Sequence, residues 1–146
     1  MSVEYEWTLS DLVRWVAVIH QRAEAAYRDM RGVADTASAE LLLGYLAARE
    51  QRLDVGTRKI LARVDDDVHI PRPEAWLSAR SPTLASVDVE SIIQWAAYVE
   101  SAVERLLQVA ATPPGVTVST SELFALHRRE LFDIGIMASR MREGRE

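Results

Sequence analysis

Residues 65–86, with the sequence DDDVHIPRPEAWLSARSPTLAS, interrupt an otherwise helical pattern. Pro71, Pro73 and Pro82 lie in this stretch, and prolines at such density stop a helix. The stretch has about 20 residues, which is enough chain to cross the length of a helical bundle. We therefore predict a long crossover here rather than a tight turn between neighbouring helices.

Apolar residues recur at helical spacing on both sides of this crossover. The pattern predicts four helices, over about residues 9–31, 37–64, 87–111 and 120–142. Thr8 or Ser10 is expected to cap the first helix, and the short connection 32–36 makes the first two helices antiparallel neighbours. The sequence thus predicts an all-α fold, in which residues 1–146 form one four-helix bundle domain with a single crossover between its second and third helices.

The composition is that of one globular domain and excludes several classes of site. Of the 146 residues, 49% are hydrophobic and 27% are charged. The absence of Cys excludes a disulfide scaffold, a thiolate zinc site and a cysteine nucleophile. The net charge of −5 argues against nucleic-acid binding. No apolar run approaches the roughly 18 residues of a membrane helix and residues 1–7 carry no basic side chain, so we expect a cytoplasmic protein.

Ionisable residues interrupt the apolar stripes of all four predicted helices. His20 in the first helix, Glu50 in the second, and His127 and Glu130 in the fourth lie near the centres of these stripes. Glu100 in the third helix lies roughly 65° from the centre of its stripe. Each residue is near the middle of its helix, so we expect the five side chains to meet in one layer of the bundle.

Burial of these five groups without compensation would cost several kcal/mol each. A metal ion is one way to compensate, because imidazole and carboxylate suit iron, manganese and zinc. The alternative is a hydrogen-bonded His–Glu network with shifted pKa values. Such a network is neutral overall if both His and one Glu are protonated.

The layout resembles the ferritin-like, rubrerythrin-type diiron-carboxylate family over about residues 9–143. In that family two helices each contribute a Glu, and the other two each contribute a Glu-x-x-His segment. His20 holds the place of the first ligand Glu, seven residues before Tyr27. Glu50, in the segment Glu-Gln-Arg-Leu, matches the Glu of a Glu-x-x-His motif, but Leu53 replaces the His.

The second half of the chain resembles the rest of the family's ligand set. Glu100 matches the single Glu of the third helix, and His127-Arg-Arg-Glu130 matches the motif of the fourth helix with its two ligand types exchanged. The resemblance therefore implies a degenerate metal centre made of His20, Glu50, Glu100, His127 and Glu130. It would hold one or two ions of iron, manganese or zinc, or none if binding has been lost.

Other ionisable residues rank below these five. A second register of the fourth helix would use Glu130-x-x-Asp133, but Asp133 lies about 90° from the apolar centre. Glu24 and Glu104 lie farther from their apolar centres, so we expect them at the rim of the layer. His69 lies in the crossover, where we expect it to be solvated.

The first and fourth helices each carry a second apolar face. Trp7 and Trp15 lie away from the inner stripe of the first helix, and Phe132 and Ile136 lie opposite His127 on the fourth. Two such faces suggest a covered patch, and a homodimer through the outer faces of these helices is the simplest cover. The crossover segment is the alternative cover.

Two functional interpretations remain open. By resemblance, the protein is a ferritin-like bundle whose degenerate metal centre handles iron, oxygen or peroxide. The alternative is a metal-free homodimeric bundle with an interaction or structural role. Leu53 favours the alternative because it cannot bind metal. Glu50, Glu100 and Glu130 favour a metal centre, because drift after its loss would have replaced them with apolar residues. The sequence leaves open whether the protein is an enzyme.

Overall fold

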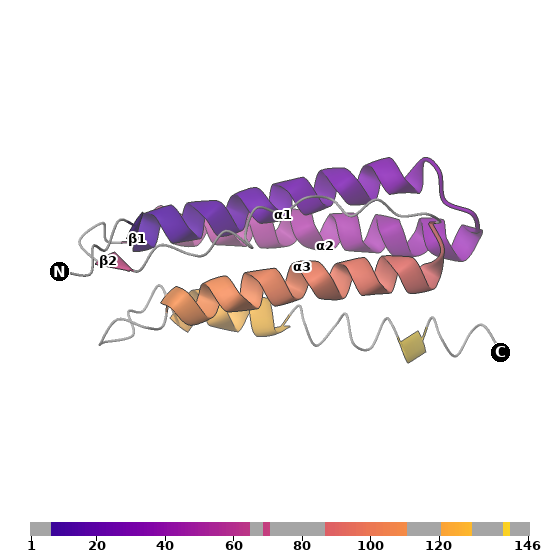
Figure 1. Ribbon diagram of the computed structural model, residues 1–146. Helices are drawn as coiled ribbons and strands as arrows, with labels where there is room; N and C mark the ends of the chain where they lie inside the picture. Colours follow the sequence, from indigo (N-terminus) through magenta and orange to yellow (C-terminus); the bar gives the residue numbers. More distant parts are fainter. Residues whose placement is uncertain (1–6, 65–68, 71–86, 111–120, 130–138, 141–146) are drawn as a thin grey trace.

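A computed structural model describes residues 7–64, 69–70, 87–110, 121–129 and 139–140. The described part is an all-α fold built from α1 (Leu9–Arg31), α2 (Ala37–Leu61), α3 (Val89–Ala110) and a fourth helical segment at residues 121–129. Residues 139–140 are also helical. The four helices lie side by side (Figure 1). Among the described residues, no helix is both long enough and apolar enough to cross a membrane.

The first helix begins and ends where the sequence predicts. Thr8 accepts a hydrogen bond from the backbone N–H of Asp11, and the Asp11 carboxylate accepts from the backbone N–H of Thr8. This reciprocal capping box satisfies two N–H groups that the first turn leaves without helical partners. Gly32 follows the last residue, and its N–H bonds to the carbonyls of Asp29 and Met30. Thr8 is thus the cap, one of the two predicted candidates.

The other helix boundaries also follow from local hydrogen bonds. Thr36 caps α2 by accepting from the N–H of Ala39, and Asp88 accepts from the N–H of Ser91 at the start of α3. The second helix ends at Leu61, three residues earlier than the sequence pattern suggests. The chain there tightens into turns bonded three residues back, from Arg63 to Ile60 and from Val64 to Leu61.

The first three helices run in directions that require a long connection. A backbone hydrogen bond from Asp35 to Val87 places the start of α3 beside the α1–α2 connection. The second helix begins at that same end and runs parallel to α3, while α1 is antiparallel to both (Figure 1). The chain between Val64 and Val87 must therefore join opposite ends of the bundle, as expected for a crossover. The predicted crossover itself, apart from residues 69–70, lies outside the described residues.

The helix at residues 121–129 runs antiparallel to α2. Its Glu122 pairs with Arg63 beyond the end of α2, and its Leu126 lies against Gly56 one to two turns earlier. In order along the chain, the four helices thus point up, down, down and up. The remaining part of the predicted fourth helix, apart from residues 139–140, lies outside the described residues.

Apolar side chains from all four helices form one continuous core. Its fully buried members include Leu12, Tyr27, Leu43, Ile92 and Leu123. A two-residue antiparallel pairing of β1 (Trp7–Thr8) with β2 (His69–Ile70) adds to the described fold, whereas the sequence pattern predicts no strand at either position. Trp7 and Trp15 are half-buried and pack against the core, so this part of the predicted second apolar face has intramolecular contacts.

Candidate metal centre

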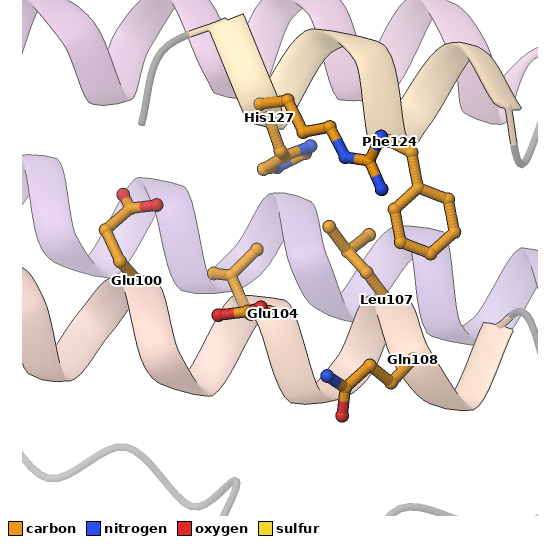
Figure 2. A pocket seen from close by; sticks show the side chains of 8 residues that line it. Glu100, Glu104, Leu107, Gln108, Phe124 and His127 are labelled. Atoms are coloured by element: carbon orange, nitrogen blue, oxygen red, sulfur yellow. The ribbon is translucent and has the colours of Figure 1, made fainter. Parts of the chain in front are cut away.

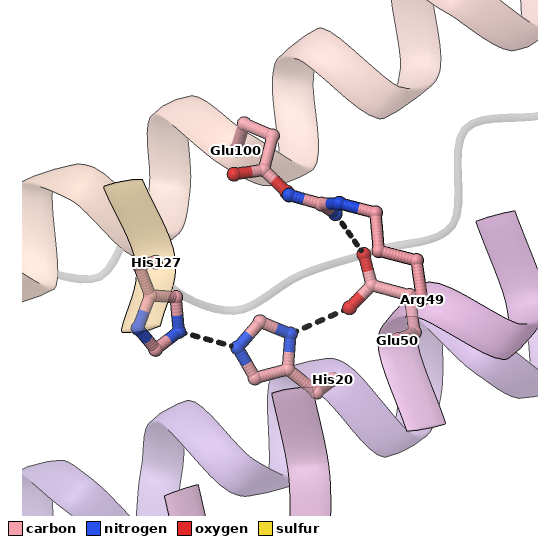
Figure 3. A network of polar contacts seen from close by, with 5 residues as sticks. All are labelled: His20, Arg49, Glu50, Glu100 and His127. Atoms are coloured by element: carbon pink, nitrogen blue, oxygen red, sulfur yellow. Dashed lines mark hydrogen bonds and ion pairs between the residues drawn. The ribbon is translucent and has the colours of Figure 1, made fainter. Parts of the chain in front are cut away.

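Two histidines face each other inside the bundle. His20 of α1 and His127 of the 121–129 helix have their Nε2 atoms 2.8 Å apart, with the two rings edge to edge and their planes 26° apart (Figure 3). His20 has no exposed surface, and His127 is 5% exposed. The pair lies within the polar layer that the sequence predicts.

An oxygen atom lies within hydrogen-bond distance of the other ring nitrogen of each histidine. His127 Nδ1 lies 2.8 Å from the carbonyl oxygen of Leu123, which can only accept, so this nitrogen carries a hydrogen. His20 Nδ1 lies 2.5 Å from Oε2 of Glu50. With His127 neutral, its Nε2 accepts and His20 Nε2 donates. One further proton must then lie between His20 Nδ1 and Glu50.

Burial opposes a positive charge on the His20 ring. It lowers the pKa of His20 to about 4, because the charged ring would lose its hydration, and the positive charge of Arg49 acts in the same direction. Glu100 opposes the shift, but by less. Burial therefore favours the neutral form of the His20 ring.

Arg49 of α2 connects Glu50 to Glu100 of α3. The guanidinium has no exposed surface, and its Nη1 donates to Glu50 Oε1 at 3.1 Å and pairs with Glu100 Oε1 at 2.6 Å (Figure 3). A guanidinium stays charged in proteins. Counting the shared proton, the charges of the five described residues of the network, His20, His127, Glu50, Arg49 and Glu100, sum to zero.

Two ionisable groups in this layer, Glu100 and Tyr27, have raised pKa values. Burial raises the pKa of Glu100, and the adjacent Arg49 partly offsets that rise. Burial also raises the pKa of Tyr27, with further contributions from Glu50 and Glu100. The Tyr27 hydroxyl has no hydrogen-bond partner among the described residues, and its ring meets Trp95 edge-on with centroids 4.8 Å apart.

A cavity of about 190 Å³ opens between α3 and the 121–129 helix (Figure 2). Its apolar walls include Val103, Leu107 and Phe124. Glu100 and His127, the two ends of the polar network, both line it. The cavity is therefore where the otherwise sealed network meets the exterior.

The structure brings together four of the five residues that the sequence singles out: His20, Glu50, Glu100 and His127. The fifth, Glu130, lies outside the described residues, as does Asp133. Glu24 and Glu104, which the sequence places at the rim of the polar layer, lie in two different surroundings. Glu24 pairs with Arg28 at 2.8 Å, and Glu104 lines the exposed side of the cavity. The backbone of His69 forms part of β2, and its side chain lies outside the described part.

Arg49 is the network residue that the sequence interpretation missed. The signal was present, because Arg49 lies seven residues after Leu42, three after Leu46 and four before Leu53, which places it within the buried stripe of α2. It was overlooked because the 16 arginines of the chain are scattered and most arginines lie at the surface.

The histidine pair fits a metal ion in part. Metal-bound histidines usually donate their other ring N–H to a carboxylate or a backbone carbonyl, and these are the partners of His20 and His127. Zinc–nitrogen bonds of about 2.0–2.1 Å in tetrahedral geometry separate two nitrogens by about 3.4 Å, so the rings would have to part by about 0.6 Å. Within the described ranges, no three His, Asp or Glu side chains converge as a ligand set. Any further ligand must therefore come from outside those ranges or from solvent.

Comparison of the chain with protein-family models, with curated proteins and with solved structures gives no match.

Proposed function

We propose that the protein binds one divalent transition-metal ion between His20 and His127, as a degenerate centre of the ferritin-like type. The observation that carries this proposal is the commitment of both Nδ1 atoms, which leaves the two Nε2 atoms converging at 2.8 Å. Without a proton between them, two lone pairs would face each other, and a cation is the natural occupant of that position. The ion would take the place of the hydrogen between the two Nε2 atoms, and the proton shared by Glu50 and His20 would stay at Nδ1.

The surroundings support this role for each residue. Glu50 orients His20 through its Nδ1, and the carbonyl of Leu123 orients His127. Glu130 follows His127 by three residues, a spacing that shares one face of a helix, so we expect it to supply a third ligand. The cavity beside His127 gives access from solvent.

The ferritin-like assignment is supported by the up, down, down, up order of the helices, which a bundle with one crossover between its second and third helices requires. A bound iron or manganese ion would supply Lewis-acid and redox chemistry at the cavity. The handling of iron, oxygen or peroxide is the function class that fits this chemistry.

The test is metal content measured on protein prepared without chelators and then saturated with Fe²⁺ without oxygen, Mn²⁺ or Zn²⁺. We expect about one ion per chain for the parent and a melting temperature that rises with added metal. His127→Ala should lose the ion. His69→Ala, which removes a histidine outside the pair, should bind as the parent does. A parent chain without near-stoichiometric metal under all three conditions would refute the proposal.

A metal-free helical bundle with an interaction role, as a homodimer, is the second candidate. Arg49 favours it, because its guanidinium and the shared proton already neutralise Glu50 and Glu100. Such a network would fix the register of the four helices without any ion. The same metal measurement separates the two candidates.

A further inference from the structure

We infer that Arg49 is the resident cation of a second cation site, formed by the carboxyl groups of Glu50 and Glu100, and that it limits the polar layer to one metal ion. The limit to one ion rests on the metal site proposed between His20 and His127. The occupancy of the second site by Arg49 stands on its own geometry.

The contacts of the guanidinium define this second site. Nη1 lies 3.1 Å from Glu50 Oε1 and 2.6 Å from Glu100 Oε1, so one nitrogen bridges carboxyl groups from α2 and α3. The side chains of Arg49 and Glu50 have no exposed surface, and that of Glu100 is 11% exposed. Hydration therefore cannot stabilise these carboxylates in place of the positive charge of Arg49.

The donor set around Arg49 would also suit a metal ion. Carboxylate oxygens from two helices are typical ligands of Mn²⁺ and related divalent ions. While Arg49 is present, both oxygens of Glu50 are engaged, Oε1 by Arg49 and Oε2 by His20. The guanidinium thus occupies the position from which a second ion would bridge Glu50 and Glu100.

Removal of the guanidinium should open this site. In Arg49→Ala, two carboxyl groups would face a cavity of the size of the lost side chain, and an added cation would relieve their repulsion. We expect the apo variant to melt roughly 10 °C or more below the parent, because a buried ion pair has lost one partner. Methylguanidinium or Mn²⁺ should restore part of that loss.

The experiment compares Mn²⁺ bound per chain, by equilibrium dialysis and elemental analysis, in the parent, in Arg49→Ala and in Arg58→Ala. Arg58 lies in the same helix and pairs with Asp54 at 2.9 Å, but it is exposed, so it is the matched control. We expect Arg49→Ala to bind one ion more than the parent and Arg58→Ala to bind the same number. The extra ion should disappear when Glu100→Gln is added to Arg49→Ala.

The outcomes separate this inference from the proposed function. If the parent binds no ion and Arg49→Ala binds one, the histidine site is wrong and the Arg49 site stands. If the parent binds one ion through His127 and Arg49→Ala binds no more, the Arg49 site is wrong. An Arg49→Ala chain that is unfolded and regains helicity and a melting transition with neither methylguanidinium nor Mn²⁺ also overturns the inference.

Discussion

The polar network joins a sealed half of the bundle to an open one. On α1 and α2, His20, Arg49 and Glu50 have no exposed surface. On α3 and the 121–129 helix, Glu100 and His127 line a cavity. In the sealed half, the side chains alone set the charges and the hydrogen-bond directions, because His20, Arg49 and Glu50 are not in contact with solvent. The open half offers the groups that an incoming ion or ligand can reach.

The largest effect is expected from breaking the sealed half at Glu50. In Glu50→Leu, Arg49 loses a carboxyl partner and His20 loses the carboxyl group at its Nδ1, so the free energy of unfolding should fall by about 3–5 kcal/mol. Urea denaturation of the apo protein measures this. Glu40→Leu is the matched control, since Glu40 lies in the same helix but is exposed, and it should change stability by less than about 1 kcal/mol.

Glu50→Gln tests where the proton shared by Glu50 and His20 resides. If the shared proton resides on Glu50, an amide reproduces its hydrogen bonds, because the amide oxygen accepts from Arg49 and the NH₂ donates to His20 Nδ1. The cost should then stay within about 1 kcal/mol. A loss as large as that of Glu50→Leu would instead mean that His20 is charged and Glu50 ionised.

The predictability of the two halves from sequence differs for a physical reason. Helical period and capping residues are local, so α1 was predicted to the residue and the buried positions of His20 and Glu50 followed from their stripes. The role of Arg49 was not local. Its partner Glu100 lies on α3, and the periodicity of a single helix does not show which side chains meet across helices. For the same reason the 2.8 Å contact between His20 and His127 could be anticipated only as a shared layer.

A pair of glycines in α2 tests how tightly the open half docks on the sealed half. A Cβ on Gly56 would lie 2.8 Å from Cδ2 of Leu126 in the 121–129 helix, whereas a Cβ on Gly44 would meet only the end of the Arg31 side chain at 3.4 Å. Gly44→Ala should stabilise the protein by about 0.5–1 kcal/mol, as expected for alanine in a helix. Gly56→Ala should be about 1–3 kcal/mol less stable than Gly44→Ala, because Leu126 must move.

Thermal and urea unfolding of the two glycine variants provide the measurement. Equal stabilities would mean that Leu126 adjusts at no cost, and that the 121–129 helix is less closely packed on α2 than the contact with Gly56 implies.

The smallest effect is expected at the exposed link between the halves. Arg63 pairs with Glu122 at 2.6 Å, which is as close as Arg49 approaches Glu100, but the Arg63 side chain is 59% exposed. Water and salt screen an exposed pair, so a double-mutant cycle of Arg63→Gln and Glu122→Gln should give a coupling of at most about 1 kcal/mol, decreasing with added salt. A coupling of several kcal/mol would contradict the view that burial, rather than distance, separates the Arg49 contacts from those at the surface.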